Sequence, residues 1–184
     1  PGSIEYDLKK IKIFTIDIEV ACEKGFPDPA DASEEILCIT IKNHNNGKII
    51  VWGTDDYTVK KEYVSFVRCN SEMHMLDEFL KFWQDNCPDI ITGWNSKLFD
   101  MAYVCNRIIN LMGERDVRKL SPWNVVRSDP IEMMGKTLAR FSILGVAQLD
   151  YMDLYKKLTV KNHESFKLDH IAEVELGKKK DENP

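Results

Sequence analysis

The sequence lacks the features that mark several large classes of protein. No apolar run in its 184 residues approaches the about 18 residues that a membrane-spanning helix needs, and no signal-peptide pattern opens the chain. The five cysteines are scattered without a C-x-x-C pair, which argues against a structural zinc site and a disulfide framework. We therefore expect a soluble, cytoplasmic protein with reduced cysteines and no membrane partner.

Basic charge and common catalytic motifs are also missing. The net charge is −5 and the isoelectric point is near 5.4, so composition gives no sign of the basic surface that many nucleic-acid binders carry. A P-loop, a G-x-S-x-G motif and a Cys-His nucleophile pattern are all absent. The acidic stretch at 28–35 lacks the spacing of an EF-hand loop. These absences leave acidic side chains as the main candidates for chemistry.

The pattern along the chain predicts one α/β domain. With 43% hydrophobic residues the chain can bury a sizeable core. Residues 1–3 resemble a cloning scar, which leaves 4–184 for the domain. Strands are expected at 11–20, 35–43, 47–53, 63–67, 89–94 and 138–149, and helices from about 71 to 87 and at 97–112, 150–158 and 166–176, with 114–137 irregular. This order predicts a mixed sheet flanked by helices.

Two carboxylates interrupt the first expected strand, which reads FTIDIEV. Asp17 and Glu19 lie two residues apart and so share one face, about 7 Å from each other, while the opposite face is apolar. Burying unpaired carboxylates is costly, so a bound cation would explain the pair. A solvent-exposed sheet face would explain it equally. The strand alone leaves both explanations open.

A third carboxylate, Asp100, stands in the first turn of an expected helix, directly after the short apolar strand DIITGW. Acidic residues are common there because they interact favourably with the helix dipole, so a purely structural role is possible. Ligand sites of α/β sheets also form where strands end and helices begin. Taken together, the three carboxylates would form a hard-oxygen site suited to Mg²⁺ or Mn²⁺.

Four segments of the chain together resemble the 3′→5′ exonuclease (proofreading) domain of family B DNA polymerases. They are FTIDIEV with GFPDP, then DIITGWNSKLFDMAYVCNRI, GERDVRKLSPW, and LDYMDLYKKLTVKNHESFKLDHIA. The similarity extends from about residue 11 to 180 and is greatest to the replicative polymerases of T-even-type bacteriophages. D-x-E alone is a weak signal, but D-x-E followed by TGWN-x-x-x-FD-x-x-Y and then DLY is specific.

The resemblance implies a ribonuclease-H-like (DEDD exonuclease) fold and two divalent metal ions, Mg²⁺ or Mn²⁺. Asp17 and Glu19 match the first exonuclease motif and Asp100 matches the aspartate of the second, so these three would be the catalytic and metal-binding residues. The family role is removal of the 3′-terminal nucleotide of DNA. The resemblance implies three partners: a single-stranded 3′ end of DNA, the polymerase domain of the same parent chain, and a sliding clamp of the parent enzyme. The expected location is the cytoplasm, that of an infected bacterium if a phage encodes the chain.

One family motif is absent. The third exonuclease motif, Tyr-x-x-x-Asp, supplies a fourth carboxylate, yet none of the six tyrosines has an aspartate four residues later. The sequence is therefore interpreted as a partial exonuclease domain that stops before this motif and is weak or inactive by itself. The alternative is a non-catalytic module of a polymerase that keeps the fold to bind DNA or to support the enzyme.

Substrate contacts are less sharply indicated. The resemblance places Phe26, Asn95 and Phe99 near the last nucleotides, although ordinary packing would explain the two phenylalanines equally. The segment 127–141 corresponds to a β-hairpin of phage relatives that helps to separate the primer end from the template. Basic residues in this segment could contact phosphates, although scattered surface charge is the commoner explanation; they are Arg127, Lys136 and Arg140.

Overall fold

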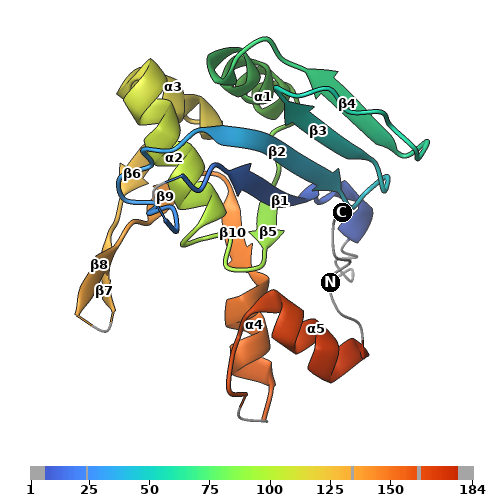
Figure 1. Cartoon of the computed structure of the whole chain (residues 1–184), viewed down its shortest axis with the longest axis vertical. Helices are drawn as coiled ribbons and strands as arrows, with labels where there is room; N and C mark the ends of the chain where they lie inside the picture. The colour runs from blue at the N-terminus through green and yellow to red at the C-terminus, as the bar shows by residue number, and fades with distance from the viewer. Residues whose placement is uncertain (1–6, 24, 134, 161–162, 178–184) are drawn as a thin grey trace, which may run out of the picture.

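A six-stranded mixed sheet forms the centre of the molecule (Figure 1). The computed structural model describes residues 7–23, 25–133, 135–160 and 163–177, so the expected scar at 1–3 lies outside the described residues. The strand order is β10-β5-β1-β2-β3-β4. The strands are β1 (Ile13–Val20), β2 (Ile36–Asn43), β3 (Ile49–Gly53), β4 (Val64–Arg68), β5 (Ile90–Gly93) and β10 (Ala147–Asp150). The predicted mixed sheet is confirmed.

Alternation along β1 decides which face of the sheet enters the core. Phe14, Ile16 and Ile18 are buried, whereas Asp17 and Glu19, on either side of Ile18, are exposed. β1 pairs antiparallel with β2 and parallel with β5, and the β2–β3 hairpin turns at the Asn-Asn-Gly stretch 45–47, where Gly47 has φ 73. The acids therefore lie on the face opposite the core, in the middle of the sheet.

Two helices cover the core face of the sheet. Helix α1 (Glu72–Asn86) follows its N-cap Ser71, close to the expected start at about 71, and the Ser71 hydroxyl accepts a hydrogen bond from the His74 amide. Its apolar side packs on β3, with the Phe79 and Phe82 rings 5.8 and 5.0 Å from the Trp52 ring. Helix α2 (Asp100–Met112) is the second cover, and Met101 to Cys105 are all buried. The amphipathic pattern of both helices matches this placement.

The stretch 114–150 is more structured than the sequence predicts. The segment expected to be irregular holds α3 (Glu114–Val117), the 3₁₀ helix η2 (Arg118–Leu120), β6 (Val126–Ser128) and β7 (Ile131–Met133). The single strand expected at 138–149 is wrong, because β8 (Lys136–Leu138), β9 (Phe141–Ile143) and β10 belong to three different sheets. Gly145, with φ 91, makes the turn between β9 and β10. Apolar strand residues continue through this turn, so composition alone did not reveal the break.

Two peripheral parts extend from the body. The β7–β8 hairpin projects from one side, and α4 (Tyr151–Leu158) with α5 (Leu168–Leu176) lies beyond the ends of β5 and β10 (Figure 1). A short 3₁₀ helix, η1 (Leu8–Lys10), precedes β1. α4 has no buried residue, and in the described part of α5 only Ile171 is buried. No helix in the described ranges is both long and apolar enough to span a bilayer.

Candidate active site

The D-x-E carboxylates stand side by side on the exposed face of β1. Asp17 is paired with Thr40 of β2 and Glu19 with Cys38. Burial raises the pKa of the Cys38 thiol, and the negative charges of Glu19 and Asp17 raise it further. Both carboxylates therefore lie near the Cys38 side chain, on one face of the sheet, as the alternation in FTIDIEV predicts.

Asp100 comes to the same strand from α2. Its side chain is only 5% exposed, and its Oδ1 accepts a hydrogen bond of 3.0 Å from the backbone amide of Ile18, the residue between the two β1 acids. Burial raises the pKa of the Asp100 carboxyl from 3.8 to about 7, and the charge of Asp17 adds to the rise. The second acidic segment therefore contacts the first through the Ile18 amide, and the Asp17 and Asp100 carboxylates repel each other.

The turn between β5 and α2 sets the position of Asp100. A Cβ on Gly93 would lie 2.7 Å from the Ser96 Cβ and 2.8 Å from the Ile16 carbonyl oxygen, so only glycine fits against β1 there. Asn95 has the left-handed φ of 61. This turn delays the start of α2 to residue 100, three residues after the expected start at 97.

Asp150 is a residue whose full role the sequence did not reveal. It caps α4 by accepting from the Met152 amide at 2.9 Å, as expected for an aspartate just before a helix. Its two oxygens also accept from the amides of Asn95 and Lys97, each at 3.0 Å. Asp150 is 6% exposed, and its charge contributes to the raised pKa of Asp100. It therefore holds the β5–α2 turn from the neighbouring strand β10.

The carboxylates fit a divalent cation in their chemistry, but not as a closed set of ligands. Asp17 and Asp100 are hard-oxygen donors whose mutual repulsion a cation would relieve. However, among the residues that the structure describes, no three His, Cys, Asp or Glu side chains lie close enough together to hold a metal ion. Asp17 is thus close enough to Asp100 for its charge to raise the pKa of the Asp100 carboxyl, and Glu19 lies two residues beyond Asp17 on β1.

A cavity of about 440 Å³ opens beside Asp17. Its polar lining includes Thr15 and His44, whose Oγ1 and Nε2 atoms are 2.7 Å apart, and its rim includes Trp94 and Tyr151. The sequence did not indicate His44, because nothing in its spacing connects it to the acids. The cavity provides space for a ligand next to the D-x-E strand.

The expected substrate residues lie in three places. Phe26 and Phe99 meet, with ring centroids 5.5 Å apart, and Phe26 remains 86% exposed. Asn95 lies in the turn held by Asp150. The basic residues lie in the region of the β7–β8 hairpin: Arg127 and Lys136 are exposed, whereas Arg140 forms an ion pair with Asp129. Phe99 of the aromatic pair directly precedes Asp100. Arg127 and Lys136 belong to the two small sheets, in β6 and β8, and Arg140 lies between β8 and β9.

Comparison with known proteins identifies the family. Residues 3–171 match the model of the exonuclease domain of DNA polymerase family B. The chain belongs to this family. It is 35% identical to the DNA-directed DNA polymerase of Escherichia phage RB69, over 98% of this chain and 23% of that protein, and 34% identical to that of Enterobacteria phage T4, over 97% and 23%.

More distant viral polymerases match as well. The DNA polymerase catalytic subunit of Human herpesvirus 8 type P is 28% identical over 92% of this chain and 18% of that protein. The exonuclease-domain chain thus spans about a quarter or less of the curated relatives that it matches. The family assignment agrees with the mixed sheet and with the order of the two acidic segments along it.

Proposed function

We propose that this exonuclease-domain chain is the proofreading part of a DNA-directed DNA polymerase and hydrolyses the 3′-terminal phosphodiester of DNA. The observation that supports the proposal most directly is the buried Asp100 carboxyl, which accepts from the Ile18 amide and is repelled by Asp17. Burial raises the pKa of this carboxyl and the charge of Asp17 raises it further, and an acid perturbed by burial together with a specific charge is characteristic of functional sites. A passive fold would gain nothing from that repulsion.

In this proposal Asp17, Glu19 and Asp100 hold two divalent cations, Mg²⁺ or Mn²⁺. Glu19 joins the set by turning its exposed side chain toward Asp17. When bound, two such ions supply an activated water and stabilise the leaving oxygen. The protein residues contribute by fixed geometry: the Ile18 amide orients Asp100, and Asp150 holds the turn that carries it. No protein nucleophile is required.

The substrate in this proposal is a single-stranded 3′ end of DNA, with the polymerase domain of a parent chain as partner. The exposed ring of Phe26, which packs against Phe99 in a tilted arrangement, offers a surface for an unpaired base. Three basic residues in or near the β7–β8 hairpin would contact phosphates of the DNA; they are Arg127, Lys136 and Arg140. Asn95 would face the terminal nucleotide. The proposal also includes a sliding clamp as a partner of the whole enzyme. The whole enzyme would act in the cytoplasm of an infected bacterium.

Degradation of a 5′-labelled single-stranded oligonucleotide with Mn²⁺ tests the activity. We expect slow 3′-end trimming, far below that of a family B polymerase with an intact exonuclease, because the sequence contains no Tyr-x-x-x-Asp motif. Trimming should disappear in Asp17→Asn and persist in Asp85→Asn, a matched control at an exposed position of α1. Trimming as fast as that of the intact enzyme would contradict the expected weakness of this chain.

Thermal unfolding with and without Mn²⁺ separates catalysis from metal binding. Saturation at a hundred times the dissociation constant adds about 2.7 kcal/mol, which corresponds to a rise in Tm of about 7 °C for a chain of this size. The rise should be lost in Asp17→Asn and kept in Asp85→Asn. A chain that neither trims DNA nor responds to Mn²⁺ would instead be a non-catalytic module of a polymerase.

A further inference from the structure

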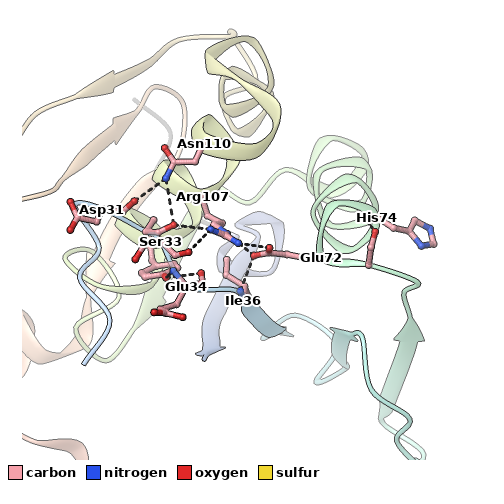
Figure 2. Close-up of polar contacts among 11 residues, drawn as sticks. Asp31, Ser33, Glu34, Ile36, Glu72, His74, Arg107 and Asn110 are labelled. Atoms are coloured by element: carbon pink, nitrogen blue, oxygen red, sulfur yellow. Dashed lines mark hydrogen bonds and ion pairs between the residues drawn. The ribbon is translucent and has the colours of Figure 1, made fainter. Parts of the chain in front are cut away.

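One face of α2 binds the backbone of the segment that links β1 to β2 (Figure 2). The spacing of four polar residues places them on the same side of the helix. Each donates to carbonyl groups of residues 29–34: Tyr103 to Glu34 at 2.8 Å, Asn106 to Pro29 at 2.7 Å, Asn110 to Asp31 at 2.8 Å, and Arg107 to Ala32 and Ser33, both at 3.0 Å. We call these four residues the α2 clamp.

Arg107 is the centre of the α2 clamp. Its Nε and Nη2 donate to the two carboxylate oxygens of Glu72 at 2.8 and 2.7 Å, while its Nη1 serves the two carbonyls. Glu72 also accepts from the Ile36 amide at the start of β2. The Arg107 and Glu72 side chains are only 13% and 9% exposed. The Arg107 guanidinium on α2 thus binds Glu72 on α1, and through Glu72 it is connected to the first residue of β2. Lysine lacks the planar fork of N–H groups that this bidentate pairing requires.

The clamped segment is continuous with the loop that carries Phe26. Pro27 is buried, and Asp28 folds the next turn by accepting from the Ala30 and Ala32 amides, each at 2.9 Å. Phe26 is therefore the exposed end of a chain segment fastened from Pro27 to Ile36. Its ring rests on Phe99, the residue directly before Asp100.

We propose that Arg107 is a positioning residue, which holds the Phe26 ring in a fixed relation to Asp100 for the binding of a single-stranded 3′ end. The inference rests on the proposed function and adds a residue that touches neither DNA nor metal. Because α2 carries both Asp100 and the clamp, movement of the loop relative to the acids is restrained before substrate arrives. An aromatic platform ordered in advance avoids the entropic cost of ordering it on binding.

A double-mutant cycle distinguishes positioning from general stabilisation. The probe is an oligonucleotide with 2-aminopurine at its 3′ end, whose fluorescence reports both binding and stacking, in Ca²⁺ buffer and at a temperature where circular dichroism shows every variant folded. We expect Arg107→Lys to raise the Kd about fivefold, the lower end of what one stacked base contributes. In the Phe26→Ala background the same substitution should change Kd less than about twofold. Lys81→Gln, which removes an exposed ion pair of α1, is the matched control and should leave Kd unchanged.

The outcomes separate this inference from the proposed function. Absence of binding by the wild-type chain would refute DNA binding itself, and the inference with it. Normal wild-type binding, combined with no effect of Arg107→Lys or an equal effect in both backgrounds, would overturn the positioning role alone. If Arg107→Lys does not fold, Asn110→Ala replaces it in the cycle, since it removes clamp contacts from an exposed position.

Discussion

Asp100 has an electrostatic environment that disfavours its charged form. It is buried against β1, faces the charge of Asp17, and is compensated by the Ile18 amide. A carboxyl whose pKa is higher in the folded state than in the unfolded state favours folding only while it is protonated. Ionisation of Asp100 as pH rises therefore lowers the free energy of unfolding.

The pH dependence of stability tests this cost in metal-free buffer. The contribution of the Asp100 carboxyl is fully present below its ordinary pKa of 3.8 and is lost as pH rises through about 7. Asp100→Asn keeps an oxygen for the Ile18 amide and removes the charge, so at pH 8 it should be more stable than wild type by on the order of 2 kcal/mol. The difference should shrink toward pH 4. Equal stability of the two proteins at pH 8 in urea titrations would contradict the raised pKa.

Gly93 is the residue at which the β5–α2 turn is most crowded. Gly93→Ala places a methyl group against the Ile16 carbonyl oxygen and the Ser96 Cβ, so the free energy of unfolding should fall by about 2 kcal/mol. Gly53→Ala is the matched control, because its Cβ would be crowded by the movable Phe66 ring, at 3.1 Å, and would meet the Cys38 Cβ at an ordinary 3.6 Å. It should cost less than about 1 kcal/mol, and a reversed ranking in urea titrations would count against the close approach.

At the level of elements, α2 connects the acids to the rest of the fold. Its first turn supplies Asp100, its apolar side fills the core, and its polar side holds the β1–β2 link through Arg107. The ion pair of Arg107 with Glu72 is part of this arrangement, and breaking a buried pair leaves an uncompensated charge.

Two ion pairs of different burial give a direct comparison. Glu72→Ala removes the carboxylate that binds Arg107 and the Ile36 amide, so it should lower the free energy of unfolding by about 3 kcal/mol. Asp56→Ala breaks the pair with Arg68, in which the Asp56 side chain is 96% exposed, and should cost less than about 0.5 kcal/mol. Chemical denaturation of both variants measures the difference, and similar losses would show that the Glu72 pair is not an energetic anchor.

In the molecule as a whole, stability is concentrated in the sheet and its two covering helices. β1, β2, β5 and α2 contain most of the fully buried side chains, whereas α4 and α5 contribute almost none in the described chain. Elements with few buried apolar contacts open by local unfolding. The acids on β1 are thus attached to the most stable part of the molecule.

Amide hydrogen exchange followed by mass spectrometry or NMR should show this division. Peptides of α4 and α5 should exchange at least about 100-fold faster than those of β1 and α2, because their opening does not require the core to unfold. Uniform protection of all helices would indicate that α4 and α5 unfold only with the whole domain.

The sequence by itself determined the features that depend on neighbours along the chain. Alternation in FTIDIEV placed Asp17 and Glu19 on one face, Ser71 marked the start of α1, and the order of strands and helices predicted the mixed sheet. The division of 138–149 into three strands did not follow, because a turn through Gly145 leaves no change in the apolar pattern.

Only the tertiary structure decided how distant groups meet. The bond from the Ile18 amide to Asp100 spans 82 residues, that from Asn95 to Asp150 spans 55, and the pair of Arg107 with Glu72 spans 35. Each depends on which strands are neighbours in the sheet and on where the helices cross it. Such pairings are set by packing of the whole core rather than by local propensity, so periodicity indicates the candidate residues while the fold determines their contacts.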